Sequence, residues 1–296
     1  MRGFTGFVEE TVDSGAVELF VRHNATPQKP ALLLLHGYPQ TSAMWHLIAP
    51  FFAEDYHVIC PDLRGYGRSE KPASQPDHSS YSKRAMAQDI VGVLDHFGYE
   101  TSLVCGHDRG GRVAHRLGLD HPDRVRALTV LDIAPTREMY ANTTEAFARA
   151  YWHWFFLILP SPQPERMIEA DPRAFWLGKN TRQAGGGTPY HPDALEEYLS
   201  TFEDPDCIRA TCEDYRAAAS IDIDHDNADC GRKLAMPVLA LWANQGAIGR
   251  CFDPLALWRL RADTVQGTVL DATHYMAEEI PDQIAELMLA FFKENG

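Results

Sequence analysis

Short apolar runs alternate along the chain with stretches of helical character. The runs predict central strands at Ala31–Leu35, His57–Cys60, Ser102–Cys105, Ala127–Leu131, Pro237–Trp242 and Thr268–Leu270. The residues around Glu10–Asn24 predict an antiparallel hairpin that precedes them. Strands that alternate with helices are typical of a mostly parallel sheet with helices on both faces, so the pattern predicts the α/β class.

Polar side chains follow each of these runs. They belong to His36, Asp62, His107 with Asp108, Asp132, Asn244 and His274. In open α/β sheets, ligands bind outside the carboxyl ends of the strands. We therefore expect these side chains to converge on one site.

The alternation stops between about 138 and 215, where aromatic residues and prolines are frequent. This segment reads as helices and loops, with a flexible turn at Gly185–Gly187. We predict a helical cap over the strand ends at 138–215, inserted into an α/β core that comprises 1–137 and 216–296.

Composition narrows the class of function. The chain has 296 residues, is 45% hydrophobic and 23% charged, and carries a formal net charge of −14. These values are typical of a globular protein and argue against a nucleic-acid partner, which requires a basic surface. An anionic substrate would be repelled at long range, so any anion site must be built locally from specific cations.

The compartment is predicted from the chain's start, its apolar runs and its cysteines. The first residues lack the apolar segment of a signal peptide, and the most apolar run, Trp154–Leu159, is too short to cross a bilayer. The six cysteines show no paired or zinc-ligand spacing. We expect a cytoplasmic protein with reduced thiols and no membrane partner.

The segment Gly106-His107-Asp108-Arg109-Gly110 has a glycine on each side of a potential nucleophile. It lies between the strand Ser102–Cys105 and a helix expected over about Gly110–Leu119, which is the context of the nucleophile elbow in the α/β-hydrolase fold. A carboxylate in that position can displace a leaving group from carbon and form an ester. Asp108 is therefore the candidate nucleophile.

Hydrolysis of such an ester requires a base. His274 follows the last strand, where the base of such a site is expected, although a lone histidine can equally be a core or surface residue. Asp132 ends the strand Ala127–Leu131 and is the expected partner that orients the histidine. A loop-capping role is the alternative for Asp132, and Asp253 is the fallback acid.

Two arginines, Arg109 and Arg112, fall in the first turn of the expected helix. Cations at a helix N-terminus are disfavoured by about 0.3–1 kcal/mol, so their presence needs a reason. One reason is an ion pair with Asp108 or with an acidic residue of the cap. The other is a fork for an anionic substrate, because arginine matches a planar carboxylate in bidentate geometry. The anionic substrate is our interpretation.

These residues resemble the haloacetate dehalogenases, specifically the fluoroacetate dehalogenases of the α/β-hydrolase superfamily, over almost the whole chain. The resemblance is carried by His36–Gln40, Asp62–Gly67, Gly106–Arg112, Val130–Ile133, Tyr151–Trp154, Cys212–Arg216 and His274.

The resemblance implies a role for each candidate residue. Asp108 would be the nucleophile of a triad with Asp132 and His274. Arg109 and Arg112 would hold the substrate carboxylate, while His153, Trp154 and Tyr215 would hold the departing halide. The last three side chains are hydrogen-bond donors without negative charge, as a leaving halide requires.

The implied activity is hydrolysis of a short 2-haloacid, such as fluoroacetate or chloroacetate, to the 2-hydroxy acid and halide. An aspartyl ester would be the intermediate, and neither a cofactor nor a metal is implied. The resemblance also implies a homodimer. The sequence departs from the family at Ala150, where relatives carry a lysine, and in lacking a tunnel tryptophan, for which Trp176 is a poor match. The preferred halogen and the access route therefore stay open.

Two other functions remain as alternatives. An epoxide hydrolase would use the same aspartate and histidine, with Tyr151, Tyr198 or Tyr215 as the acid, but gives the arginines no role. A non-catalytic protein that binds a small acid is the other.

Two further segments have a structural interpretation. Asp222–Asn227 resembles the start of a calcium loop but lacks the required glycine and glutamate, so we expect a solvated acidic turn. His36-Gly37 is expected to shape a loop that leaves the backbone N–H of Tyr38 facing the substrate.

Overall fold

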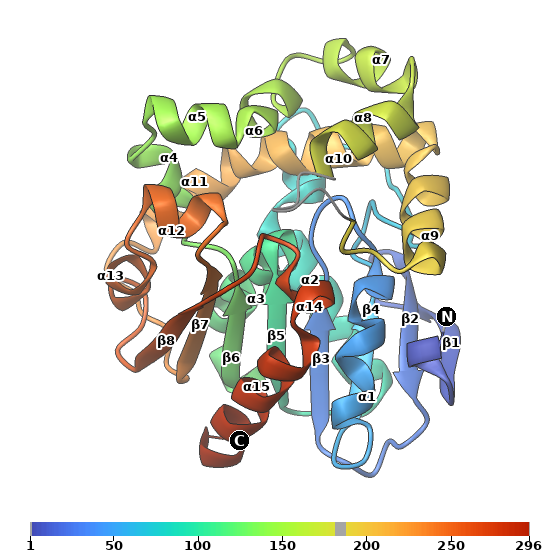
Figure 1. Cartoon of the computed structure of the whole chain (residues 1–296), viewed down its shortest axis with the longest axis vertical. Coiled ribbons are helices and arrows are strands. Elements are labelled where there is room, and N and C mark those ends of the chain that lie inside the picture. Colours follow the sequence, from blue (N-terminus) through green and yellow to red (C-terminus); the bar gives the residue numbers. More distant parts are fainter. Residues whose placement is uncertain (1, 181–187, 296) are drawn as a thin grey trace.

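The computed structural model describes residues 2–180 and 188–295 (Figure 1). Within them, eight strands form one sheet in the order β1-β2-β4-β3-β5-β6-β7-β8. The strands are β1 (Phe7–Asp13), β2 (Glu18–Asn24), β3 (Ala31–Leu35), β4 (His57–Pro61), β5 (Ser102–His107), β6 (Val125–Leu131), β7 (Val238–Ala243) and β8 (Val265–Leu270). The hairpin β1–β2 is antiparallel and β3 to β8 run parallel, which confirms the predicted α/β-hydrolase fold.

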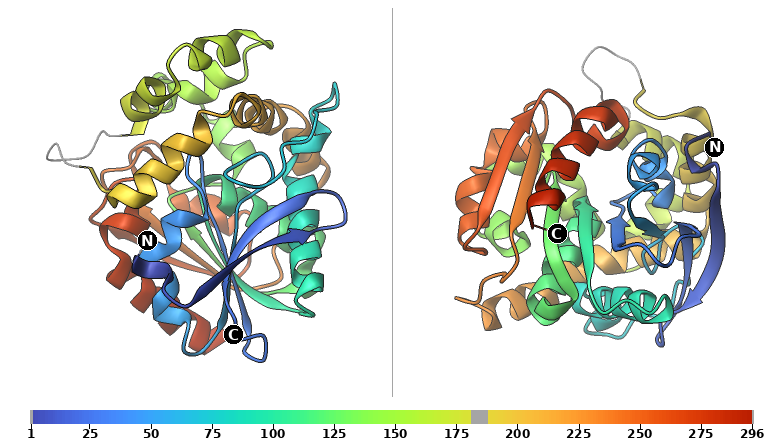
Figure 2. Two further views of the ribbon diagram at one scale, coloured as in Figure 1. Left: turned by 90° about the vertical axis from the view of Figure 1, so that its right-hand side faces the viewer. Right: turned by 90° about the horizontal axis from the view of Figure 1, so that it is seen from below.

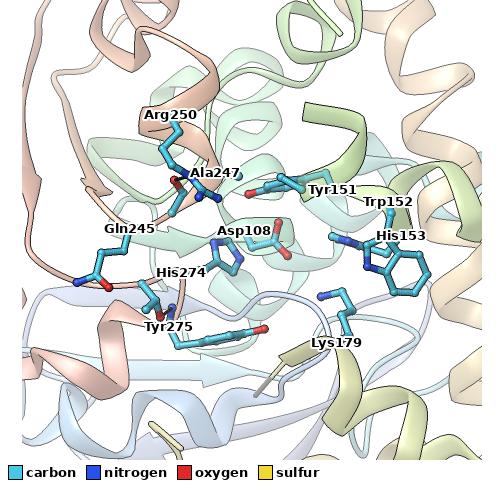
Figure 3. A pocket seen from close by; sticks show the side chains of 13 residues that line it. Asp108, Tyr151, Trp152, His153, Lys179, Gln245, Ala247, Arg250, His274 and Tyr275 are labelled. Carbon is cyan, nitrogen blue, oxygen red and sulfur yellow. Dashed lines mark hydrogen bonds between the residues drawn. The ribbon is translucent and has the colours of Figure 1, made fainter. Parts of the chain in front are cut away.

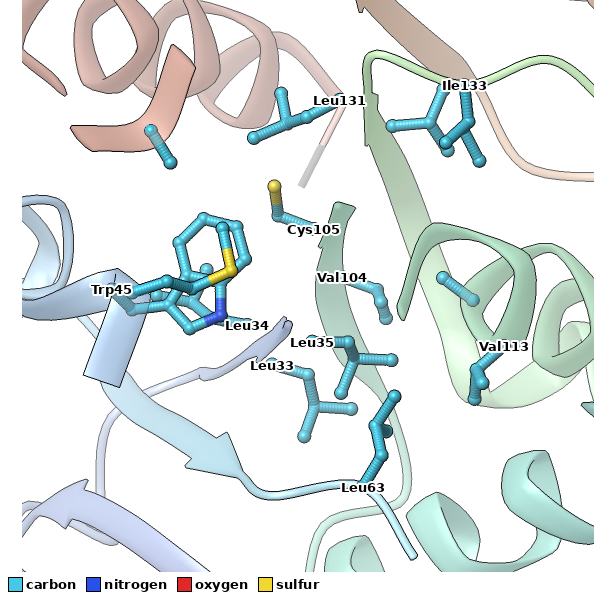
Figure 4. Close-up of a cluster of buried hydrophobic side chains, with 14 of the residues drawn as sticks. Leu33, Leu34, Leu35, Trp45, Leu63, Val104, Cys105, Val113, Leu131 and Ile133 are labelled. Carbon is cyan, nitrogen blue, oxygen red and sulfur yellow. The ribbon is translucent and has the colours of Figure 1, made fainter. Parts of the chain in front are cut away.

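The central strands form the core. All five residues of β3 are buried, as expected for a strand that helices cover on both faces. Figure 4 shows Leu33, Leu34 and Leu35 beside Val104 of the neighbouring β5, with Val113 packed from the following helix. This apolar layer holds the carboxyl ends of the strands in fixed register.

Helices cover both faces of the sheet (Figure 2). The helices outside the β6–β7 connection are α1 (Ala49–Phe52), α2 (Lys83–His96), α3 (Asp108–Asp120), α12 (Ala247–Cys251), α13 (Pro254–Arg259), α14 (Met276–Glu279) and α15 (Pro281–Asn295). Short 3-10 turns are η1 (Arg2–Phe4), η2 (Ser42–Leu47), η3 (Ser79–Tyr81) and η4 (Pro122–Arg124). Helices α2 and α3 pack together, and α1 and α15 form a second contacting pair.

In the part that the structure describes, the connection from β6 to β7 consists of helices joined by turns and loops. It contains α4 (Thr136–Ala141), α5 (Glu145–Ala150), α6 (Trp152–Leu157), α7 (Gln163–Glu169), α8 (Pro172–Asn180), α9 (Pro192–Phe202), α10 (Pro205–Ala218) and α11 (Ile221–Ala228). Helices α5, α6, α8 and α10 lie across the carboxyl ends of the strands (Figure 1). Both predicted cap boundaries, 137/138 and 215/216, fall inside helices, α4 and α10 respectively. The division at those residues stays a prediction.

One local expectation was wrong. The segment from Asp222 to Asn227 belongs to helix α11 and is not a solvated turn. Asp222 and Asp226 are buried, and they pair with Lys83 at 3.5 Å and with Arg116 at 2.6 Å. These two ion pairs with distant helices are invisible in the local sequence. The turn expected at Gly185–Gly187 lies outside the described residues. No helix in the described part of the chain is both long and apolar enough to traverse a bilayer.

Candidate active site

The turn between β5 and α3 places Asp108 at the carboxyl edge of the sheet. Its backbone has φ +44°, a left-handed conformation that side chains other than glycine rarely adopt. A Cβ atom at Gly106 would lie 2.5 Å from the carbonyl oxygen of Gly110, and one at Gly110 would lie 2.2 Å from that of Leu35. The two glycines of the motif are therefore required by close packing around the turn.

Asp108 is buried, with 4% of its surface exposed. Its Oδ2 accepts a hydrogen bond from the backbone N–H of Tyr38 at 3.2 Å. Burial raises the pKa of Asp108, but electrostatic interactions with His274 and the Arg112 guanidinium more than offset this, so its pKa lies below the ordinary value. The side chain is thus an anionic carboxylate at neutral pH.

Asp132 and His274 come together at the ends of β6 and β8. His274 Nδ1 donates to Asp132 Oδ2 at 2.6 Å, and Asp132 Oδ1 accepts from the Ala243 N–H at 3.0 Å. Nε2 of His274 makes no hydrogen bond to any described residue and is free to face a water molecule. Asp253, the fallback acid, lies elsewhere and caps α13 through the Ala256 N–H at 3.0 Å.

Arg109 does not present its fork to the cavity. Nε and Nη2 donate to the carboxylate of Asp214, on cap helix α10, at 2.9 and 2.5 Å. This is the ion pair with an acidic cap residue that the sequence left open, and it occupies the bidentate edge that we had expected to bind substrate. Only Nη1 of Arg109 is buried without a partner among the described residues.

Arg112 is held from the other side of the elbow. Its Nη1 donates to the Ala134 carbonyl at 3.1 Å and to Thr136 Oγ1 at 2.8 Å, and Nη2 contacts Met139 Sδ at 3.4 Å. Nε is left buried and unpartnered in the described structure. Each arginine therefore keeps one unpartnered donor nitrogen while the protein fixes the rest of its guanidinium group.

The three expected halide ligands come from two cap helices. The ring of Tyr215 on α10 lies 5.8 Å from that of His153 and 6.4 Å from that of Trp154, both on α6. The guanidinium carbon of Arg109 is 4.3 Å from the Tyr215 ring centroid, and that of Arg112 is 4.7 Å from the Trp154 ring centroid. The cap thus places these rings against the two arginines.

These side chains leave several donors without an acceptor. Within the described residues, Trp154 Nε1, Tyr215 Oη, Arg109 Nη1 and Arg112 Nε are buried and make no hydrogen bond. Leaving a buried donor unpaired costs about 1–3 kcal/mol, more if it is charged, so such groups are rare in folded proteins. A cluster of them indicates a place where a ligand supplies the acceptors.

A cavity of about 570 Å³ opens beside Asp108 (Figure 3). Its wall comprises Asp108, Ala150, Tyr151, Trp152, His153, Lys179, Gln245, Gly246, Ala247, Arg250, Thr273, His274 and Tyr275. Arg109, Arg112, Trp154 and Tyr215 are not part of this wall, although they contact its residues or one another. Asp108 lines the cavity and also interacts electrostatically with Arg109 and Arg112 of the buried cluster.

Sequence reasoning missed two cations of the wall, Lys179 and Arg250. Trp152 is 38% exposed and lines the cavity, while its ring also contacts Phe156 and Phe175. Lys179 and Arg250 lie on helices α8 and α12 and belong to no recognisable motif. No local signal in the sequence marks these two cations, whereas Trp152 begins the aromatic run of α6.

Other expected site residues have structural roles. Asp62 accepts from the backbone N–H groups of Ser42 and Arg68 at 2.7 and 2.9 Å, and Asn244 donates to Asp271 at 2.9 Å. His36 accepts from the Leu63 N–H at 2.9 Å. The strand ends therefore supply both the site and the loops around it, and not all of them converge.

The aromatic residues of the second cap segment also pack internally. Trp176 is buried and donates its indole N–H to the Pro39 carbonyl at 3.1 Å, so it is not a tunnel residue. Tyr198 stacks on Trp176 and donates to Glu278 at 3.2 Å. Its hydroxyl is therefore committed to the protein, which leaves Tyr151 and Tyr215 as the cap tyrosines beside Asp108.

Comparison with known proteins gives three consistent findings. A family model for the alpha/beta hydrolase fold matches residues 30–184. A fluoroacetate dehalogenase from Burkholderia sp. is 41% identical over 292 residues, which cover 98% of this chain and 95% of that protein. A soluble epoxide hydrolase from Corynebacterium sp. (strain C12) is 32% identical over 266 residues, covering 88% and 89%.

Solved structures agree with this. A protein from Nostoc sp. PCC 7120, described as an alpha/beta hydrolase, superimposes with a TM-score of 0.93 at 49% identity. The match covers 98% of this chain and 99% of that structure. The similarity extends over the core and the cap together.

Proposed function

Because the chain belongs to the haloacetate dehalogenase family of the α/β hydrolases, we propose that it hydrolyses a short 2-haloacid to the 2-hydroxy acid and halide. Fluoroacetate or chloroacetate is the proposed substrate. The observation that carries this proposal is the cluster of buried, unpartnered donors beside an anionic carboxylate in an elbow turn. A haloacid supplies the two acceptors that such a cluster lacks, a carboxylate and a leaving halide.

In the first step, Arg109 Nη1 and Arg112 Nε bind the carboxylate of the substrate. Because the remaining guanidinium nitrogens are held by Asp214 and by Thr136, the two donors are fixed in position before the substrate arrives. Asp108 then attacks the α-carbon from the side opposite the halogen. The halide leaves with the electron pair of its bond to carbon, toward His153, Trp154 and Tyr215.

In the second step, water hydrolyses the aspartyl ester. His274 Nε2 takes a proton from the water, and Asp132 stabilises the imidazolium that forms. The water attacks the carbonyl carbon of Asp108, and the Tyr38 N–H, whose nitrogen lies 3.2 Å from Oδ2, would stabilise the oxyanion. The bond between that carbon and the ester oxygen then breaks, and the oxygen leaves as the hydroxyl of the product, taking the proton back from His274. The expected role of the Tyr38 loop thus enters the mechanism as a hydrogen bond to the nucleophile itself.

A single-turnover experiment in heavy-oxygen water tests the covalent route. The new hydroxyl oxygen of the product comes from Asp108, so we expect unlabelled glycolate from the first turnover and label on the Asp108 carboxylate. Peptide mass spectrometry and product mass spectrometry measure the two. Label that appears directly in the first glycolate would contradict the ester intermediate.

Epoxide hydrolysis is the second candidate, favoured by the similarity to the Corynebacterium enzyme and by the unpartnered hydroxyl of Tyr215. It would use Tyr151 and Tyr215 as acids for the epoxide oxygen. It offers no acceptor for Arg109 Nη1 and Arg112 Nε. Turnover of fluoroacetate, chloroacetate and styrene oxide by the same preparation separates the two, and we expect activity on the haloacids alone.

The cytoplasmic location and the homodimer stay predictions from the sequence and the resemblance. Analytical ultracentrifugation at micromolar concentration tests the dimer. A single species at the monomer mass would contradict it.

A further inference from the structure

Helix α8 of the cap brings a lysine into the cavity. Lys179 lines the wall on the same side of Asp108 as His153, whereas His274 and Gln245 lie on the other side (Figure 3). Its Nζ is 4.8 Å from the ring centroid of Tyr38. The Tyr38 ring in turn lies 6.1 Å from that of His153 and 5.2 Å from that of Tyr215. Lys179 therefore shares an aromatic surface with two of the proposed halide ligands.

Lys179 lacks a counter-ion within the described structure. Its hydrogen bond goes to the neutral amide oxygen of Asn180, at 2.9 Å. Two buried cations nearby are matched by carboxylates: Arg109 pairs with Asp214, and Lys83 contacts both Asp214 and Asp222. Burial lowers the pKa of Lys179 to about 8, although the Asp108 carboxylate acts in the opposite direction, so the ammonium form prevails at neutral pH. A cation that lines a cavity and forms no ion pair within the described structure indicates an anionic ligand.

The proposed halide ligands supply donors but no charge. Burial, together with the positive charge of Lys179, keeps the pKa of His153 well below its usual range, so the imidazole is neutral. Trp154 and Tyr215 are neutral donors. Of the two arginines, Arg109 is neutralised by Asp214, and Arg112 faces both Asp108 and the substrate carboxylate. When the halide departs, its full negative charge thus meets no cation from this set.

We propose that Lys179 contacts the departing halide beside His153 and supplies the positive charge that stabilises it. This rests on the proposed function. As Asp108 Oδ forms its bond to the α-carbon, the carbon–halogen bond breaks and its electron pair stays on the halide. The Lys179 ammonium donates a hydrogen bond to the halide, and no proton is transferred.

The halide series tests this role, because fluoride carries the most concentrated charge and depends most on a neighbouring cation. We expect Lys179→Met to lower kcat for fluoroacetate about 100-fold, as removal of one charge-stabilising donor does, and for bromoacetate by less than about 10-fold. Lys179→Arg keeps the charge and restores most of the loss on fluoroacetate. Lys293→Met removes an exposed lysine of α15 and is the matched control, with no expected change.

The pH profile gives an independent readout. Lys179 is charged below its pKa, so wild-type kcat on fluoroacetate should fall as pH rises through about 8. This alkaline fall in kcat should be absent in Lys179→Met and should move to higher pH in Lys179→Arg. If the lysine had only a structural role, the alkaline fall in kcat would be the same in wild type and in both variants.

The outcomes are distinguishable. An equal loss of kcat for all halides, a rise in KM alone, or no change would each overturn the role at the halide; the second would place Lys179 on the substrate carboxylate. A variant that has lost its thermal transition is replaced by Lys179→Gln, to which the same criteria apply. If wild-type enzyme releases halide and the variants show no halide dependence, only this inference fails. If wild-type enzyme releases no halide from any haloacetate, the proposed function fails and this inference with it.

Discussion

The triad on the core side of the site and the aromatic residues on its cap side are built on different rules. On the core side, acceptors are satisfied before any substrate arrives: Asp132 holds both His274 and the Ala243 N–H, and Asp108 accepts from the Tyr38 N–H. On the cap side, Trp154 Nε1 and Tyr215 Oη are buried without partners in the described structure. The core side is thus rigid and preorganised, while the cap side is complementary to a molecule that is not protein. Substitutions on the core side should therefore abolish catalysis of every substrate, and those on the cap side should change the relative rates for different substrates.

The strongest test of the core side is the nucleophile. Asp108→Asn keeps the shape of the elbow but removes the anionic oxygen, so we expect halide release to fall on the order of 10⁵-fold or more. A halide electrode measures the rate, and an intact-mass measurement confirms the substitution. Activity close to wild type would contradict Asp108 as the attacking group.

The assignment of Asp132 as the triad acid can be tested against Asp253, the alternative acid. We expect Asp132→Asn to lower kcat about 10⁴-fold, because the amide no longer stabilises the His274 imidazolium. Asp253→Asn is the matched control: asparagine caps helices about as well as aspartate, so α13 and the activity should both persist. A large loss in the Asp253 variant with little in the Asp132 variant would reverse the assignment.

The ion pair between Arg109 of the core and Asp214 of the cap should mainly affect the stability of the fold. Asp214→Asn leaves the buried charges of Arg109 and Lys83 without their shared carboxylate, which should cost about 3–5 kcal/mol in the free energy of unfolding. Denaturant titration measures this cost. Exposed Asp263→Asn, which loses only a surface pair with Lys233, is the control and should cost no more than about 1 kcal/mol.

The same pair sets a pH dependence. The positive charges of Arg109 and Lys83 outweigh the effect of burial and hold the pKa of Asp214 far below its ordinary value of 3.8. A depressed folded-state pKa contributes stability that is fully present above 3.8 and is lost as pH falls below it. Thermal transitions of wild type and Asp214→Asn should therefore converge on acidification. A constant gap between them down to the lowest pH would contradict the ion pair.

The smallest expected effect lies on the cap side. Tyr215→Phe removes one neutral donor, so kcat on fluoroacetate should fall about 10-fold while the stability of the free protein is unchanged or rises, since the hydroxyl has no partner to lose. Initial rates and a thermal melt measure the two. A marked loss of stability would show that the hydroxyl serves the fold, and the contrast between the core side and the cap side of the site would not hold there.

The sequence was most informative where function follows from a position on the sheet. The predicted strand Ala31–Leu35 is observed with the same ends, and the elbow, Asp132 and His274 all lie at carboxyl ends of parallel strands. The cations and the acidic segment that it missed or left open lie on helices. Arg109 pairs with the cap residue Asp214, Lys179 enters the cavity from α8, and Asp222 is buried in α11.

The physical reason is the range of the interactions. A parallel strand with an apolar run and a glycine-flanked turn is specified by neighbours in the chain, because its steric and burial requirements act over a few residues. The amino-acid order therefore determined the α/β-hydrolase sheet, the carboxylate at its elbow and the order of the triad. Only the tertiary structure decided where the cap helices lie on that sheet. It thereby decided which cations are already neutralised by protein carboxylates and which, like Lys179, remain for a ligand.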